Sequence, residues 1–204
     1  QAQTWPSKPV TVIVPFAAGG NTDGIARMIS QRLSDAFGQP FVVENKGGAG
    51  GALAADFVAR AQPDGYTMFV TAVPVLAIVP KMMKVRYDPI LHFAPISNIA
   101  SNPFVLVVST ALPINSVAEL VAYVRERKGG VSYASAGHGS LTHLSMALFL
   151  KQAGIDMTHI PYKGNAPALS DVIAGHIPAM FSNLSDALPQ IASGTVRPLA
   201  VSGS

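Results

Sequence analysis

Two glycine-rich segments of the chain have the residue types and spacing that bind a small anion. The first is PFAAGGNTD at 15–23, and the second is SAGHGS at 135–140. Each follows an apolar run and precedes a helical pattern, so each is expected to lead a strand into a helix N-terminus. The first amides of a helix lack partners and the helix dipole is positive at this end, so a carboxylate or phosphate is bound there without Lys or Arg. The two loops therefore predict one anion bound by two lobes.

The second segment also contains side chains that could act as nucleophile and base. Ser135 or Ser140, paired with His138 or His143, would suit an α/β acyl hydrolase. However, the sequence around Ser135 is YASAG rather than GxSxG, and no acid is placed to orient either histidine. The two histidines also lack the HExxH spacing of a zinc site. We therefore expect neither an enzyme nor a metal site.

Other glycine-rich and polar turns have simpler explanations. The GGAGG run at 47–51 lacks the spacing of a dinucleotide fingerprint, and no GxxxxGK[ST] motif occurs, so no cofactor is expected. Tyr162 and Lys163 could reach a ligand, or their turn could only begin the helix that includes Pro167. Asp23 could contact a ligand, or it could only stabilise the helix dipole from the first turn. Thr22 or Asp23 is expected to cap the helix that follows the first loop.

Strand and helix patterns alternate along the chain and would position these loops. Helical spacing follows the first loop and stops at Gly38, and a Ser116 and Glu119 capping box opens a later helix. This alternation predicts α/β lobes with mostly parallel sheets, which bind ligands at the carboxyl ends of their strands. Strands are expected at 8–15, 41–44, 66–71, 104–109, 131–134, 157–161, 177–181 and 196–201.

Composition excludes several classes of protein. Of the 204 residues, 49% are hydrophobic and 12% are charged, which suits a folded protein with a large core. The apolar stretch at 66–80 is too short to cross a bilayer, and the net charge of +3 is too scattered for a nucleic-acid interface. Because the chain has no cysteine, disulfide and thiolate chemistry are absent.

Five segments together resemble one known family over nearly the whole chain. They are PFAAGGNTDGIAR at 15–27, VVENKGGAGG at 42–51, YASAGHGSLTHL at 133–144, HIPYKGNAPAL at 159–169 and ALPQIASGTVRPLAV at 187–201. In this order they resemble the solute-binding proteins of tripartite tricarboxylate transporters, which are also called Bug receptors.

The resemblance implies a periplasmic binding protein-like fold, in which two α/β lobes joined by crossover strands close on a small carboxylate. Residues 1–100 would form lobe 1, residues 101–196 lobe 2, and residues 197–204 a crossover strand back toward lobe 1. The ligand would be a mono-, di- or aromatic carboxylic acid delivered to a membrane permease. The mature chain would be periplasmic, with its signal peptide removed. A ligand-sensing subunit of a signalling system remains the alternative.

The resemblance also implies which residues bind the ligand. They come from two loops that contact the carboxylate and from strand ends that line the cleft further. Those residues are Phe16, Ala17, Ala18, Gly19, Gly20, Thr22, Asp23, Thr71, Ala72, Ser135, Ala136, Gly137, His138, Gly139, Ser140, His143, Tyr162, Lys163 and Asn183.

Three departures from the family pattern carry their own expectations. Ser182 stands where members often have an aspartate, which makes an amino-acid ligand less favourable. His138 stands where smaller or amide side chains are common, and it could donate a further hydrogen bond to the carboxylate. Members usually continue well beyond the strand at 196–201, so the chain is expected to be truncated at its C-terminus, and a dimer through the exposed sheet edge is plausible.

Overall fold

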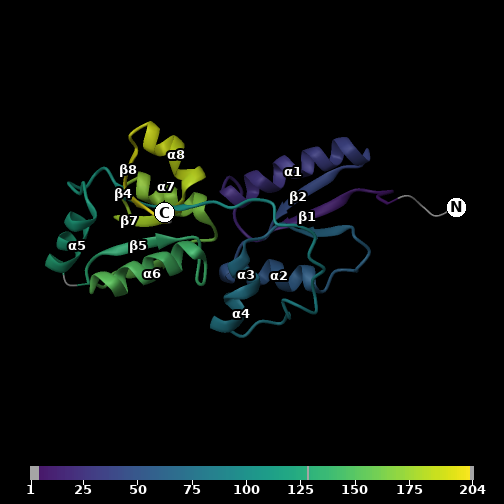
Figure 1. The fold of residues 1–204 in the computed structure, drawn as a ribbon, viewed down its shortest axis with the longest axis horizontal. Helices are drawn as coiled ribbons and strands as arrows, with labels where there is room; N and C mark the ends of the chain where they lie inside the picture. The colour runs from purple at the N-terminus through teal and green to yellow at the C-terminus, as the bar shows by residue number, and fades with distance from the viewer. Residues whose placement is uncertain (1–4, 128, 203–204) are drawn as a thin grey trace. The chain divides into compact units, whose positions relative to one another are not determined.

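The computed structural model of the protein describes residues 5–127 and 129–202. They form two compact units, the first ending at Ile96 and the second beginning at Ser97 (Figure 1). The expected lobe boundaries at residues 100 and 196 stay predictions, although the last strand pairs inside the second unit. In the described ranges, no helix combines the length and apolarity needed to cross a membrane.

Unit 1 is a three-stranded parallel sheet, as the sequence predicts, and its strand order is β2-β1-β3. Valines of β1 pack with Ala26 of α1 in one cluster, and Phe69 of β3 lies in a second cluster with Ala55 and Val75. Figure 1 shows α1 and α2 on opposite sides of these strands. The elements are β1 (Val10–Val14), α1 (Asn21–Phe37), β2 (Phe41–Asn45), the 3-10 helix η1 (Ala49–Gly51), α2 (Ala52–Ala59), β3 (Thr67–Phe69), α3 (Val73–Ala77) and α4 (Val79–Met82).

Unit 2 is a five-stranded sheet in the order β6-β5-β7-β4-β8. Helices connect most of its strands, which is the alternation that the sequence predicts. The elements are β4 (Phe104–Ser109), α5 (Val117–Glu126), β5 (Ser132–Ser135), α6 (Leu141–Ala153), β6 (Thr158–Pro161), α7 (Asn165–Ile173), β7 (Ala179–Asn183), α8 (Leu184–Ala192) and β8 (Val196–Val201).

The sheet of unit 2 is mixed, because one strand runs against the others. Strands β6, β5 and β7 are parallel, but β4 runs antiparallel to both β7 and β8. Strand β4 is the first strand of unit 2, and it begins beside the end of β7 rather than beside its start. Phe104 begins β4 opposite Asn183, and its amide and carbonyl bond to Ser202. Strand β4 therefore begins, and β8 ends, at the edge of the sheet where β7 ends.

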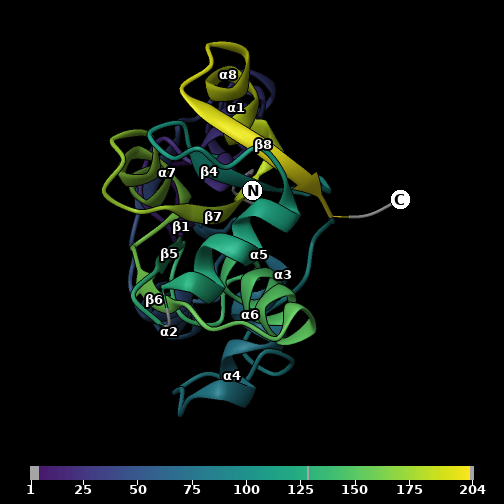
Figure 2. The same cartoon turned by 90° about the vertical axis from the view of Figure 1, so that its left-hand side faces the viewer.

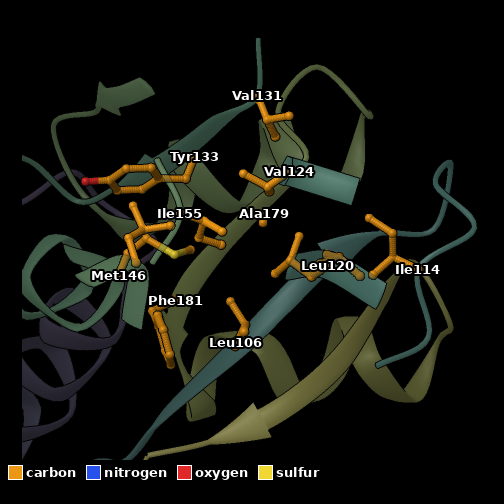
Figure 3. Close-up of a cluster of buried hydrophobic side chains, with 12 residues drawn as sticks. Leu106, Ile114, Leu120, Val124, Val131, Tyr133, Met146, Ile155, Ala179 and Phe181 are labelled. Carbon is orange, nitrogen blue, oxygen red and sulfur yellow. The ribbon is translucent and has the colours of Figure 1, made fainter. Parts of the chain in front are cut away.

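Two apolar clusters cover the two faces of this sheet. Leu106 and Val108 of β4 pack with α5 and α6, whereas Val105 and Val107 pack with α7 and α8. This is the alternation of a strand buried on both faces. Figure 2 shows helices α5 and α6 on one side of strands β4 and β7, and helix α8 on the opposite side. In Figure 3, the ring of Tyr133 lies against the first cluster, and its hydroxyl points away from it.

The helix ends confirm one predicted cap and correct another. The Ser116 hydroxyl accepts from the Glu119 amide at 3.1 Å, as the capping box predicts. Helix α1 is preceded by Gly20 and has no side-chain cap, so the expectation that Thr22 or Asp23 caps it is wrong. The reason is that the helix already begins at Asn21, which places both side chains inside its first turn.

Candidate functional site

The three parallel strands of unit 1 end at one edge of their sheet. Predicted site residues follow two of these strands, and a further polar residue ends the third. Strand β1 leads into the loop 15–20, β3 leads to Thr71 and Ala72, and β2 ends at Asn45. The carboxyl ends of neighbouring parallel strands lie side by side, so these segments share that edge. Asn45 was not among the predicted site residues.

Asp23 organises this edge from inside helix α1. Its buried carboxylate accepts from the Arg27 Nε at 2.9 Å, the Gly19 amide at 3.0 Å and the Asn45 Nδ2 at 2.9 Å. Burial raises the pKa of Asp23, but these hydrogen bonds together with the Arg27 charge lower it below its usual value. The same Asn45 amide also donates to the Phe16 carbonyl at 3.0 Å. Asp23 and Asn45 therefore fix the loop in place.

The first turn of α1 supplies the anion-binding groups of this loop. The Gly19 amide is occupied by Asp23, whereas the amides of Thr22 and Asp23 have no hydrogen-bond partner among the described residues. Gly19 has a φ of 84°, a backbone conformation that glycine adopts without strain. The helix N-terminus can therefore bind a carboxylate even though one predicted donor is already used.

The corresponding loop of unit 2 follows β5 and is held by its own side chains. Ser140 caps α6, where its hydroxyl accepts from the His143 amide at 3.3 Å and donates to the Gly137 carbonyl at 2.7 Å. The Ala136 amide donates to the Thr142 hydroxyl at 2.9 Å, and the Gly137 amide donates to the Ser135 hydroxyl at 3.1 Å. The loop is therefore rigid before any ligand arrives.

This rigidity changes which amides are available to a ligand. The Gly139 amide donates to Nδ1 of His143 at 3.1 Å, so most of the loop amides are engaged. Among the described residues, the amides of His138, Leu141 and Thr142 have no partner. A carboxylate at this loop is consequently expected to bind through the His138 amide and the first turn of α6.

Three histidine rings gather beside this loop. His138 and His143 were predicted site residues, whereas His159 of β6 was not. His143 and His159 stack with ring centroids 4.1 Å apart, and the His138 ring stands nearly perpendicular to His159 at 4.8 Å. The Tyr133 ring lies nearly parallel to His159 at 4.9 Å and to His143 at 6.5 Å. Only the pairing of β5 with β6 brings His159 here, opposite Tyr133.

Burial keeps two of these rings neutral. Burial lowers the pKa of His159 to about 4, with smaller contributions from His143 and His138. Burial and the neighbouring His138 also lower the pKa of His143. At neutral pH both rings are therefore uncharged, and they interact with a ligand through lone pairs and N–H groups rather than as cations.

The remaining predicted residues of unit 2 lie at the ends of β6 and β7. The Tyr162 hydroxyl donates to Asp171 of α7, and burial together with that carboxylate raises the pKa of Tyr162 to about 12. Lys163 is exposed, and Asn183 ends β7 and donates to Asp186 at 3.4 Å. The structure thus directs the hydroxyl of Tyr162 toward helix α7, and a ligand contact by Tyr162 or Lys163 stays a prediction.

A buried polar group beside Asn183 was missed by the sequence reasoning. Asn165 begins α7, and its Nδ2 donates to the Ser182 hydroxyl at 2.9 Å and to Asp186 at 2.7 Å. Its Oδ1 has no hydrogen-bond partner in the described part of the chain. Ser182 is fully buried, so it serves this internal contact.

The geometry gives little support to a serine hydrolase. Ser135 is fully buried, and its hydroxyl lies 2.6 Å from Nε2 of His159 rather than near His138 or His143. The Ser140 hydroxyl bonds to Gly137 and Thr142. Within residues 5–127 and 129–202, no carboxylate bonds to His159, so the pair lacks the third group that orients a catalytic base.

Comparison with known proteins identifies the class of protein. A structure described as a periplasmic transporter is 42% identical and matches with a TM-score of 0.93, covering 98% of this chain and 67% of that one. MatC from Rhodopseudomonas palustris with bound malate is 34% identical with a TM-score of 0.92, covering 98% and 68%. An R. palustris protein with adipate is 38% identical with a TM-score of 0.89, covering 98% and 68%. The fold is that of the periplasmic binding proteins.

The family follows from the sequence comparison. The model of the tripartite tricarboxylate transporter family receptor matches residues 25–204. BugT of Bordetella pertussis is 37% identical over 205 residues, which cover all of this chain and 63% of BugT. The chain belongs to this receptor family, which confirms the resemblance seen in its motifs. It spans about three fifths of the length of the curated relatives that it matches.

Proposed function

We propose that the chain is a receptor for a small carboxylate and serves a tripartite tricarboxylate-type membrane transporter. The observation that carries the proposal is the pair of strand-to-helix loops, 15–20 and 136–140, each at the carboxyl edge of its own sheet. Each places unpaired first-turn amides where an anion binds a helix N-terminus. The malate and adipate in two structural relatives support the choice of a carboxylate.

The two loops offer different donors to the ligand. In unit 1, the amides of Thr22 and Asp23 bind a carboxylate oxygen, while the buried Asp23 side chain keeps the loop closed. In unit 2, the His138 amide and the first turn of α6 do so, with neutral imidazole N–H groups beside them. Such bonds to an ionised oxygen are about twice as strong as neutral ones. Thr71, Ala72 and Asn183 contact the rest of the ligand.

The cellular role is proposed from the family. The mature protein acts in the periplasm, binds a mono-, di- or aromatic carboxylic acid without catalysis, and delivers it to permease subunits. The alternative of a ligand-sensing subunit uses the same binding event and differs only in the membrane partner. The acyl hydrolase alternative requires an exposed nucleophile, and the burial of Ser135 argues against it.

A thermal-shift panel tests this function. Mono-, di-, tri- and aromatic carboxylates, including malate and adipate, are compared with phosphate and with amino acids. A ligand that binds only the folded chain adds about 2.7 kcal/mol of stability at a hundredfold excess over its Kd. We expect shifts with a subset of carboxylates only. A flat panel from a cooperatively melting chain would contradict the proposal, as would turnover of an ester substrate that a serine substitution abolishes.

A further inference from the structure

We propose that His138, His143 and His159 form a binding site for a divalent transition-metal ion of the zinc, copper or nickel class. The three side chains come from three positions of unit 2: the loop after β5, the first turn of α6, and strand β6. Each offers a ring nitrogen, and these atoms all lie within 4.8 Å of one another. Imidazole is the protein ligand that these three ions share.

Side-chain rotation closes the remaining distance. Zinc–nitrogen bonds of about 2.0–2.1 Å in a tetrahedral site place ligand nitrogens roughly 3.3 Å apart. The stacked rings of His143 and His159 must therefore tilt toward each other, and the perpendicular His138 ring must move inward. His138 is exposed and lies between Gly137 and Gly139, which both have positive φ angles. It is consequently the ligand that can move at least cost and that an arriving ion meets first.

The protonation states suit a metal ligand. An imidazole binds a metal through the lone pair of a neutral ring, so a histidine with a lowered pKa needs no proton removed at neutral pH. Burial lowers the pKa of both His143 and His159. The rings are also close enough that their protonated forms repel one another, whereas a shared cation would satisfy all three.

The surroundings of His159 resemble the support that metal-binding histidines usually have. Such a histidine donates its other N–H to a neighbouring oxygen, which fixes the ring. Nε2 of His159 lies 2.6 Å from the Ser135 hydroxyl, which accepts from the Gly137 amide and can donate to the Gly137 carbonyl at 3.3 Å. With Nε2 protonated, the Nδ1 lone pair of His159 is available to the ion. Tyr133, packed into the core, stacks against the ring.

One hydrogen bond competes with the metal. The Gly139 amide donates to Nδ1 of His143, so an ion bound at this atom displaces that bond. The exchange gives up one hydrogen bond, which is a small loss beside the binding energy of a site with three nitrogens. A site with three histidines also leaves one coordination position for water or another oxygen ligand. Metal binding does not depend on carboxylate binding, so either proposal can fail without the other.

Isothermal titration calorimetry with zinc, nickel and copper salts tests the site on tag-free, chelator-treated protein. We expect one ion per chain, and we expect His138→Gln and His159→Gln each to weaken binding at least tenfold. His92→Gln is the matched control, because His92 lies in unit 1, where its Nδ1 accepts from the Asp88 amide and its own amide donates to the Asp88 carbonyl. It should leave the affinity unchanged.

Copper electron paramagnetic resonance provides a second readout, in which nitrogen hyperfine coupling reports the imidazole ligands. Thermal melts establish that each variant is folded. If His159→Gln does not fold, the result for His138→Gln tests the proposal, because His138 is exposed. Absence of saturable binding would overturn the proposal. Equal binding by the wild type and folded His138→Gln, or equal losses in His138→Gln and His92→Gln, would overturn it as well.

Discussion

Asp23 illustrates how a residue near a binding loop can act on the loop rather than on the ligand. Its type and position allow a ligand contact, but its carboxylate is buried and bonds to Arg27, Gly19 and Asn45. Removing the charge leaves donors from two side chains and a backbone amide facing a poorer acceptor. The loop that precedes α1 should therefore depend on this one side chain.

We predict that Asp23→Asn lowers the free energy of unfolding by about 2 kcal/mol. The asparagine keeps the shape of the side chain but turns an amide toward existing donors. Urea denaturation at neutral pH measures the change. Asp35→Asn, on the exposed face of the same helix, is the control and should change stability by less than about 0.5 kcal/mol. Equal effects of the two substitutions would show that the Asp23 network contributes nothing.

The pH dependence of this difference provides a separate prediction. The pKa of Asp23 is lowered in the fold from its usual 3.8, so the unfolded state binds a proton first as the pH falls. The stabilisation is fully present above the unfolded-state pKa and is lost as the pH falls through the lower folded-state pKa. The stability gap between the wild type and Asp23→Asn should thus be constant from neutral pH to about 5 and shrink below 3.8. Denaturation at several pH values measures it, and a gap that grew on acidification would contradict the assignment.

At the level of single residues, sequence predicts the loops but not their long-range partners. Glycines and hydroxyl residues next to a strand end are visible in one continuous segment. Strand pairing and helix packing alone bring three further residues to the two loops, namely Asn45, His159 and Asn165. Nothing in their local spacing indicates those contacts. The three-histidine cluster is invisible to a search for HExxH for the same reason.

Helix α6 combines a structural cap with a binding loop, and α5 has the cap alone. Ser140 and Ser116 each accept a first-turn amide, yet only Ser140 also bonds across the loop to the Gly137 carbonyl. Substituting each serine in turn therefore distinguishes the effect of a lost helix cap from the effect of a loosened loop, because both helices belong to unit 2.

We predict that Ser140→Ala and Ser116→Ala each cost about 1 kcal/mol of stability, the usual value of a lost N-cap. Only Ser140→Ala should also weaken carboxylate binding, because it releases the loop that presents the His138 amide. Chemical denaturation and ligand titration of both variants measure the two effects. Unchanged affinity in a folded Ser140→Ala variant would remove this loop from the binding site.

Two glycines of unit 1 differ in whether the surrounding structure has room for a side chain. Gly51 has a φ of 96°, and a Cβ there would lie 2.7 Å from Cγ2 of Val75 and 3.1 Å from Cβ of Pro15. Gly24, inside α1, has nothing within 4 Å of the same atom. We predict that Gly51→Ala destabilises unit 1 by about 2 kcal/mol, whereas Gly24→Ala stabilises the chain by about 0.5–1 kcal/mol. Thermal denaturation gives both signs, and a neutral Gly51→Ala would mean that the turn relaxes freely.

Element order was predictable, whereas the direction of one strand was not. Alternating apolar and helical patterns placed every strand of both units close to its observed range. Strand β4 has the same apolar run as a parallel strand, since both of its faces are buried. Its antiparallel direction follows from where the chain enters the sheet, beside the carboxyl end of β7, which periodicity does not report.

On the scale of the whole molecule, the chain is two folding units joined by one irregular segment. Each unit has its own sheet and its own apolar clusters. Unit 1 also exposes large apolar side chains, among them Ile90 and Leu91 at 83% and 80%. Exposed apolar surface of this kind favours association. The dimer proposed from the sequence is therefore best checked by light scattering during size-exclusion chromatography.

The segment that joins the units should be the first site of proteolysis. Residues 95–101 are exposed, belong to no helix or strand, and lie at the boundary between the two units. Local opening there breaks few buried contacts, whereas opening within either sheet disrupts a core. We predict that a low concentration of a broad-specificity protease cuts the native chain first between residues 95 and 101, yielding two fragments that resist further digestion. Mass spectrometry of the early products locates the cut. Initial cleavage within α6 or β7, or rapid loss of both fragments, would show that the units do not hold their folds independently.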